Sequence, residues 1–228
     1  ENLIGQRLLL MKDVAAYKWQ HQLAVEDPER EVVVLAAAIQ DGLRVGLTTD
    51  SSADFFQIQM AAGKEIQTYW IAHWSGGAAK PERIPDLAVE IRPKLLQLGE
   101  QITSAVAQTS VVDRRQFLSA LEVEGLSKQS KAQIYDAFAA LDYYPDRLTQ
   151  ILDSGFLRIG TTGDYAPFSL KADGATEFSG VDIELARDLA SALGVKPVFV
   201  QTSWPTLMAD LQSGKFDIAM GGISRTLE

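Results

Sequence analysis

The spacing of apolar residues changes near residue 152, and this change restricts the chain to two unlike parts. Before it, apolar residues recur three and four positions apart over long segments, which is typical of amphipathic helices. After it, short apolar runs alternate with helical segments. A chain of 228 residues is long enough for two such domains. We therefore expect an all-helical domain over residues 1–147, a linker over 148–154 and an α/β domain over 155–228.

Five or six helices are expected in the first part. Asp27 and Pro28 mark one of their starts, since Asp favours the N-cap and Pro favours the first helical turn. Gly76 and Gly77 mark an end. The expected helices are one carrying the apolar stripe Leu8–Trp19, one from Pro28 to about Leu43, Ser51–Trp74, Asp86 to about Val106, and two shorter ones around Arg114–Leu121 and Lys128–Leu141.

The second part is expected to form a parallel sheet. A strand–helix–strand–helix–strand order at short spacing is typical of parallel strands joined by crossover helices. The expected strands are Phe156–Thr161, Pro197–Gln201 and Phe216–Met220, and the expected helices are Val181–Leu193 and Pro205–Gln212.

Composition excludes several kinds of chemistry. The chain has no cysteine and two histidines, which excludes disulfides and thiolate sites and leaves little for a histidine metal cage or a Ser-His-Asp relay. A formal charge of -9 argues against nucleic acid and acidic membrane surfaces as partners. No apolar run approaches the roughly 20 residues of a membrane helix. No basic and apolar leader is present, so we expect any export signal to have been removed.

Cationic residues lie beside the apolar stripe of the first helix. Arg7 and Lys18 are eleven positions apart, or ~1100° of rotation, so both leave the helix on one face. Two cations next to a buried face indicate an anionic ligand between them. Taken alone, each cation is also explained by a long side chain that places its charged end in water. Asp27, Arg30 and Glu31 share one side of the second helix, where capping and a local ion pair are the alternative explanation.

These residues lie within a series of segments that resembles a known family. The segments are Gln6-Arg7-Leu8, Val14–Trp19, Val25–Glu31, Phe56–Gln67, and Asp86-Leu87 followed by Ile91-Arg92-Pro93. Over about the first 145 residues they resemble the secreted, gamma-type helical chorismate mutases. The resemblance implies rearrangement of chorismate to prephenate, a site built within a single chain, and a homodimer or higher homo-oligomer.

The resemblance also implies a role for each site residue. Arg7, Arg30 and Arg92 would bind the two carboxylates of the substrate, and Lys18 and Gln67 would face its ether oxygen. Asp27 and Glu31 would approach the ring hydroxyl. Gly63 stands where a small hydroxyl residue is common, which removes one donor. A Claisen rearrangement needs no nucleophile, proton transfer, metal or cofactor, only a restrained substrate and donors aimed at the ether oxygen.

The second part resembles another family. Its segments Thr161–Tyr165 and Gly221–Ser224 are similar to those of exported cyclohexadienyl dehydratases, which share the fold of periplasmic amino-acid-binding proteins. This implies a partial α/β (βαβαβ) periplasmic-binding-protein-like lobe, with backbone N–H groups at Gly221-Gly222 open to an anion. The implied ligand-binding residues are Thr162, Asp164, Tyr165, Trp204, Gly222, Ser224 and Thr226. Without the resemblance, a tight turn with capping residues would explain them.

Together the resemblances imply a bifunctional, periplasmic or secreted enzyme of aromatic amino acid biosynthesis leading to phenylalanine. Such dehydratases continue beyond the point that matches Glu228, so we expect the dehydratase half to be incomplete and inactive. Two alternatives remain. One is a non-catalytic solute-binding sensor with a helical dimerisation domain, and the other is a structural bundle with solvated cations.

Overall fold

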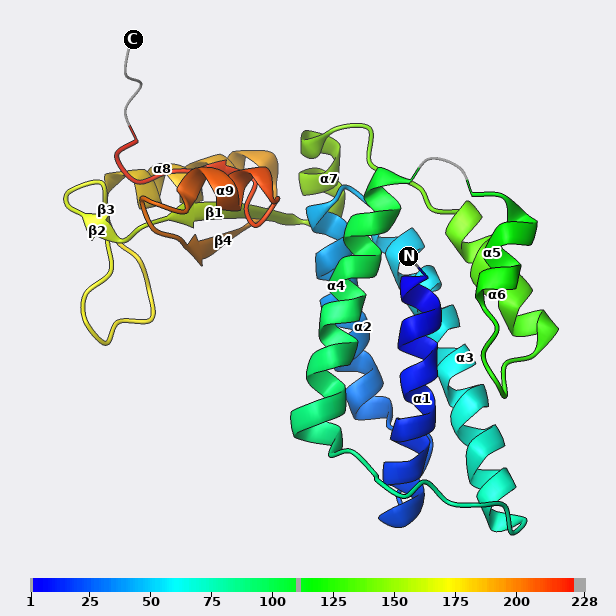
Figure 1. Ribbon diagram of the computed structural model, residues 1–228. Helices are drawn as coiled ribbons and strands as arrows, with labels where there is room; N and C mark the ends of the chain where they lie inside the picture. Colours follow the sequence, from blue (N-terminus) through cyan, green and yellow to red (C-terminus); the bar gives the residue numbers. More distant parts are fainter. Residues whose placement is uncertain (1, 110–111, 224–228) are drawn as a thin grey trace. The chain divides into compact units, whose positions relative to one another are not determined.

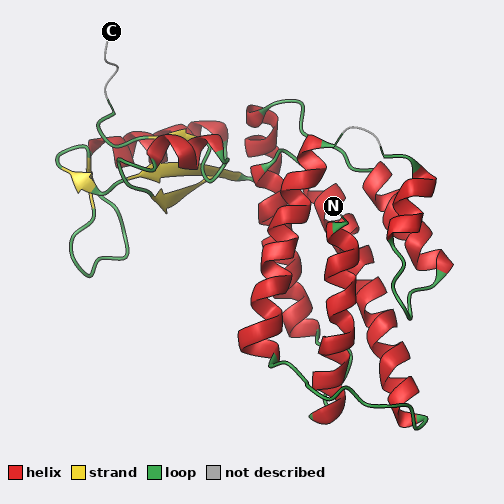
Figure 2. Ribbon diagram, viewed as in Figure 1, coloured by secondary structure: helices red, strands yellow, loops and turns green. Residues whose placement is uncertain are grey.

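The computed structural model describes residues 2–109 and 112–223. Contacts between Cα atoms group the chain into two compact units (Figure 1). The first comprises Glu1–Leu43 and Leu47–Tyr143, and the second comprises Arg44–Gly46 and Tyr144–Glu228. Within the described residues the first unit is helical, and the paired strands lie in the second (Figure 2). This confirms the expected fold class, an all-α domain followed by a parallel α/β lobe.

The first unit contains the helices that the apolar periodicity predicts. They are α1 (Leu3–Gln20), α2 (Pro28–Arg44), α3 (Thr49–Ser75), α4 (Arg92–Gln108), α5 (Arg114–Ala120) and α6 (Lys128–Ala139). The predicted fourth helix begins with a π-helical turn, η1 (Leu87–Ile91), whose N-cap is Asp86. Polar side chains cap the first turns of other helices because the first amides of a helix have no partner within it. These caps are Asn2, Thr48, Asp113 and Ser127.

Helix α1 is the centre of the first unit. It packs against both α3 and α4, as Figure 1 shows, and α3 also packs against α6. Fully buried side chains fill these contacts: Leu8, Ala15, Phe55, Ile66, Ile102 and Ile134. Removal of this apolar surface from water is the main stabilising term for such a bundle.

Helix α2 is held mainly through its C-terminal half. Its buried residues are Ala38, Gly42 and Leu43, and none lies in the first ten positions of the helix. Gly42 allows a close approach to α3, since a Cβ there would lie 2.1 Å from the Ser52 Oγ. The first turns of α2, which carry the predicted site residues, therefore have no fully buried side chain.

The second unit contains a three-stranded parallel sheet in the order β4-β1-β5. Its strands are β1 (Phe156–Thr161), β4 (Lys196–Gln201) and β5 (Ile218–Ala219), and its crossover helices are α8 (Val181–Leu193) and α9 (Leu207–Gln212). The parallel sheet and the order of elements are confirmed. Two short antiparallel strands, β2 (Asp164–Tyr165) and β3 (Ser169–Leu170), were not predicted.

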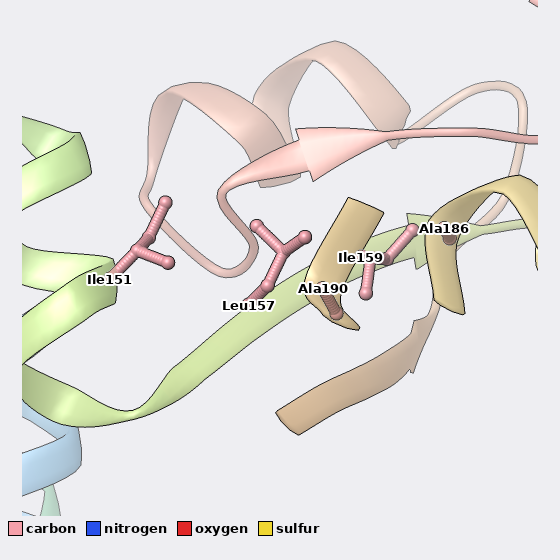
Figure 3. Close-up of a cluster of buried hydrophobic side chains, with 5 residues drawn as sticks. All are labelled: Ile151, Leu157, Ile159, Ala186 and Ala190. Atoms are coloured by element: carbon pink, nitrogen blue, oxygen red, sulfur yellow. The ribbon is translucent and has the colours of Figure 1, made fainter. Parts of the chain in front are cut away.

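The segment expected to be a linker, residues 148–154, is helical. Helix α7 (Arg147–Ser154) is capped by Asp146 and ends at Gly155, which has a φ of 74°. Its Ile151 joins the buried cluster of β1 and α8 formed with Leu157, Ile159, Ala186 and Ala190 (Figure 3). The helix itself was not predicted, because it carries a single buried apolar side chain, Ile151, too few for a clear periodicity.

A buried ion pair connects α7 and β1 to the start of the last strand. The Asp217 side chain is 2% exposed, lies 2.7 Å from Arg158 Nη2 and 3.5 Å from Arg147 Nη1, and accepts the Arg158 N–H at 2.8 Å. Removing one partner of such a group leaves the other charge uncompensated.

We predict that Asp217→Ala lowers the free energy of unfolding of the second unit by about 3 kcal/mol. Hydrogen exchange of the β1 amides in native buffer would measure this loss locally. The surface variant Asp188→Ala, also in the second unit, is the matched control and should change stability by less than about 0.5 kcal/mol. Equal exchange in the two variants would contradict the assignment.

Candidate active site

A cavity of about 160 Å³ opens among α1, α2, α3, η1 and α4 in the first unit. Its apolar walls are Met11, Val14, Val25, Val34, Met60, Leu87, Leu95 and Leu96. Its polar lining comprises Arg7, Lys18, Asp27, Arg30, Glu31, Gln59, Lys64, Gln67 and Arg92. Five of these are cationic and two are anionic, in a chain whose formal charge is -9. The pocket is therefore locally positive and suited to an anion.

A larger cavity, of about 450 Å³, lies between the first residues of α1, the end of α4 and α5. Its described lining includes one charged residue, Asp113. Charge rather than size therefore identifies the smaller cavity as the candidate site.

The structure brings together seven of the eight residues predicted for this site. Arg7, Lys18, Asp27, Arg30, Glu31, Gln67 and Arg92 line the one pocket. Gly63 does not line it but lies one helical turn from Gln67 and accepts a hydrogen bond from its amide. The convergence of these scattered residues agrees with the sequence analysis, and the role of each remains a prediction.

Arg7 is a buried cation without a counter-charge. Its side chain projects from the buried face of α1, the residue is 7% exposed, and its Nη1 atom has no hydrogen-bond partner. None of the ion pairs between described residues includes Arg7. Burial lowers the pKa of Arg7 from its ordinary value to about 10. A buried charge left unpaired is costly, so this position favours an anionic ligand.

Lys18 is held at the pocket by the backbone. Its Nζ donates to the Val25 carbonyl at 2.6 Å, in the loop between α1 and α2. Desolvation lowers the pKa of Lys18, while the carboxylates of Asp27 and Glu31 oppose this shift. Arg92 lowers the pKa further by charge repulsion. The ammonium group thus has one fixed partner and donors left for a ligand.

The start of α2 is organised by its two carboxylates. Asp27 Oδ1 accepts the Arg30 N–H at 3.1 Å and so caps the helix. Glu31 Oε1 accepts the Asp27 N–H at 3.4 Å, and its Oε2 lies 3.0 Å from Lys64 Nζ. The capping part of the alternative explanation is therefore also correct for Asp27, whereas the ion pair of Glu31 is formed with Lys64 on α3 rather than locally.

Gln67 is buried, with 6% of its surface exposed. Its Nε2 donates to the Gly63 carbonyl at 3.2 Å and to Met11 Sδ at 3.6 Å, while its Oε1 is buried without a partner. A Cβ at Gly63 would lie 3.0 Å from Met11 Sδ. Met11 therefore occupies the space beside Gly63, where a hydroxyl residue would need room.

Two polar residues of the pocket, Gln59 and Lys64, were missed by the sequence analysis. Gln59 is fully buried and its Oε1 has no partner. It lies one helical turn before Gly63, so the spacing that paired Gly63 with Gln67 could have found it. Lys64 pairs with Glu31, which is 33 positions away. No local pattern signals that contact.

Four of the predicted ligand residues of the second unit lie close together. Trp204 Nε1 donates to Asp164 Oδ1 at 3.1 Å, and the Tyr165 and Trp204 rings are 6.1 Å apart. A Cβ at Gly222 would lie 2.4 Å from the Tyr165 ring. Thr162 is buried and its Oγ1 has no partner. Ser224 and Thr226 lie outside the described residues.

The expectation of free amides at Gly221-Gly222 was wrong. Both N–H groups donate to Asp182 Oδ2, at 2.9 Å from Gly221 and 2.7 Å from Gly222. Asp182 lies in the first turn of α8, far from the two glycines in sequence. A carboxylate of the protein already occupies the position in which an external anion was expected.

No described helix combines the length and apolar character needed to span a membrane. Within residues 2–109 and 112–223, no group of three or more His, Cys, Asp or Glu side chains could hold a metal ion.

Known proteins match the two parts of the chain separately. Residues 2–68 match the family "Chorismate mutase type II", and residues 157–228 match "Bacterial extracellular solute-binding proteins, family 3". A monofunctional chorismate mutase of Enterobacter agglomerans is 31% identical over 144 residues, which cover 60% of this chain and 79% of that protein. The structure of a secreted chorismate mutase from Yersinia pestis aligns with a TM-score of 0.59 and 26% identity, covering 63% of this chain and 96% of that one.

The second part has a separate relative. A cyclohexadienyl dehydratase of Pseudomonas aeruginosa is 50% identical over 92 residues, which cover 40% of this chain. The chain spans about a third of that protein, 34% of its length. For the helical part, in contrast, the match to the mutase of Enterobacter agglomerans covers 79% of the relative. By this match this chain belongs to the chorismate mutase family.

Proposed function

We propose that the helical unit rearranges chorismate to prephenate. The observation that carries this proposal is the buried, unpaired Arg7 guanidinium in a pocket that also holds Lys18, Arg30 and Arg92. A substrate with two carboxylates would supply the missing counter-charges. The related mutases that cover most of this unit support the same substrate.

The reaction requires no group outside the substrate. As the C–O bond of the ether breaks, a C–C bond forms within the same molecule, and negative charge develops on the ether oxygen. Arg7, Arg30 and Arg92 would bind the carboxylates and hold the compact conformer in which the reacting carbons approach. Lys18 and Gln67 would stabilise the charge on the oxygen. Asp27 and Glu31 would contact the ring hydroxyl.

An assay of chorismate consumption and prephenate formation with the purified chain tests the proposal. We expect both at neutral pH, with one prephenate formed for each chorismate consumed. Binding of an amino acid without conversion of chorismate would favour the solute-binding sensor instead. If the chain neither converts chorismate nor binds an amino acid, only the structural bundle remains.

Gln67→Glu should move the activity to acid pH. A glutamine donates a hydrogen bond at any pH, whereas a glutamate donates only when protonated. Burial raises the pKa of a carboxyl above its usual value of about 4.3. The variant should therefore be active below that raised pKa and lose activity as the pH rises through it.

A pH–rate profile from about pH 4 to 9 would measure this shift, since carboxyl and histidine groups titrate within it. Gln101→Glu, at an exposed position on α4, is the control and should leave the profile unchanged. A Gln67→Glu profile that matches the parental one would exclude Gln67 from the reaction.

We further propose that the second unit is the beginning of a dehydratase-like lobe that would act on prephenate in a bifunctional enzyme. The 50% identity to a cyclohexadienyl dehydratase supports this, as does the cluster of Asp164, Tyr165 and Trp204.

The boundary between the domains would lie near Tyr143-Tyr144. Export from the cytoplasm is supported by a relative named a secreted chorismate mutase. A homodimer or larger homo-oligomer remains a prediction, which light scattering tests.

A further inference from the structure

Lys64 is a pocket residue that the family resemblance does not assign. It follows Gly63 on α3 and lines the cavity. Its Nζ lies 3.0 Å from Glu31 Oε2, and the two side chains are 32% and 31% exposed. The pair therefore lies at the border between the pocket and solvent, where it is only partly screened.

This pair connects the first turns of α2 to α3. Residues 28–37 have no fully buried side chain, as the buried residues of α2 begin at Ala38. Among the described residues, Lys64–Glu31 is the one ion pair between this half-helix and another helix. Arg30 lies in the same helical turn as Glu31. A contact that fixes the position of Glu31 therefore also fixes the position of Arg30.

The pair also affects the charge that a substrate would meet. Glu31 lines the same pocket as Arg7, Lys18 and Arg30, and an uncompensated carboxylate there would repel a dianion. The Lys64 ammonium group offsets that charge at a distance of 3.0 Å. Lys64 itself has no hydrogen-bond acceptor among the described side chains other than Glu31.

We propose that Lys64 is a positioning residue of the mutase site, acting through Glu31. It fixes Glu31, and with it the start of α2, against α3, and so keeps Arg30 at the pocket. Its charge also reduces the repulsion between Glu31 and a dianionic substrate. This inference rests on the proposed function of the helical unit.

Lys64→Met should raise KM for chorismate about five- to tenfold while kcat changes less than about threefold, because binding of the dianion weakens more than the chemical step. Lys64→Arg, which keeps the charge, should restore most of the affinity. In a Glu31→Gln background, Lys64→Met should have little further effect on KM, since the carboxylate on which it acts is gone.

Lys131→Met is the matched control. It removes a similar ion pair, Lys131–Glu122 at 3.1 Å, from another part of the same unit and should leave KM unchanged. Circular dichroism would check folding, and Lys64→Gln would replace Lys64→Met if that variant does not fold.

The outcomes separate the two proposals. If the parental chain does not convert chorismate, the proposed function fails. If it does, and Lys64→Met has a parental KM, only the inference about Lys64 fails. An effect of Lys64→Met that is undiminished in the Glu31→Gln background would mean that Lys64 contacts the substrate directly, which would also overturn a positioning role.

Discussion

Lys18→Ala should lower kcat for chorismate by about 100- to 1000-fold, the usual cost of removing one donor to a developing oxyanion. The expectation follows from the position of the ammonium group, which the Val25 carbonyl anchors 2.6 Å away at the pocket. Asp27 and Glu31 favour its charged form against desolvation. The alanine variant loses both the charge and the donor, so the ether oxygen would develop its charge with Gln67 alone.

Steady-state kinetics of chorismate consumption would measure this loss. Lys12→Ala is the control, since Lys12 lies on the same helix but its ammonium group contacts the Trp70 ring rather than the pocket. We expect the control to retain kcat within about threefold, as it removes no donor to the reacting oxygen. A Lys18→Ala variant with parental kcat would remove Lys18 from the mechanism.

Arg7→Met should have two opposite effects. We expect kcat/KM to fall by about 100-fold or more, because a buried charged contact to a substrate carboxylate is lost. We also expect the free energy of unfolding of the first unit to rise by about 1 to 3 kcal/mol, because an unpaired buried cation is replaced by an apolar side chain of similar length. A residue that destabilises the fold while serving a ligand is typical of binding sites.

Urea denaturation of the ligand-free proteins would measure the stability, and kinetics the activity. Arg114→Met is the matched control, since Arg114 is exposed and paired with Asp136 at 2.5 Å, so neither quantity should change by much. Loss of stability in Arg7→Met would show that Arg7 has a structural partner. Retained activity would show that it does not bind the substrate.

Local sequence signals were sufficient to predict an element whose bounds are set by its own residues. The apolar repeat and Gly194 predicted α8 at Val181–Leu193, and Asp27-Pro28 predicted the start of α2. The pocket residues were selected by the family resemblance. They lie in separate segments, and helical periodicity within one segment does not show which other segments it meets. Seven of those residues line one cavity.

The sequence by itself determined the two fold classes and the approximate positions of most helices, and with the resemblance it selected seven residues that line the pocket. Only the tertiary structure decided that Glu31 pairs with Lys64, that Asp182 binds the amides of Gly221 and Gly222, and that Arg147–Ser154 form helix α7. Apolar periodicity and helix capping involve residues that are a few positions apart, so both can be recognised in the sequence. A contact between residues 33 or 40 positions apart depends on how whole elements pack, and no local pattern records it.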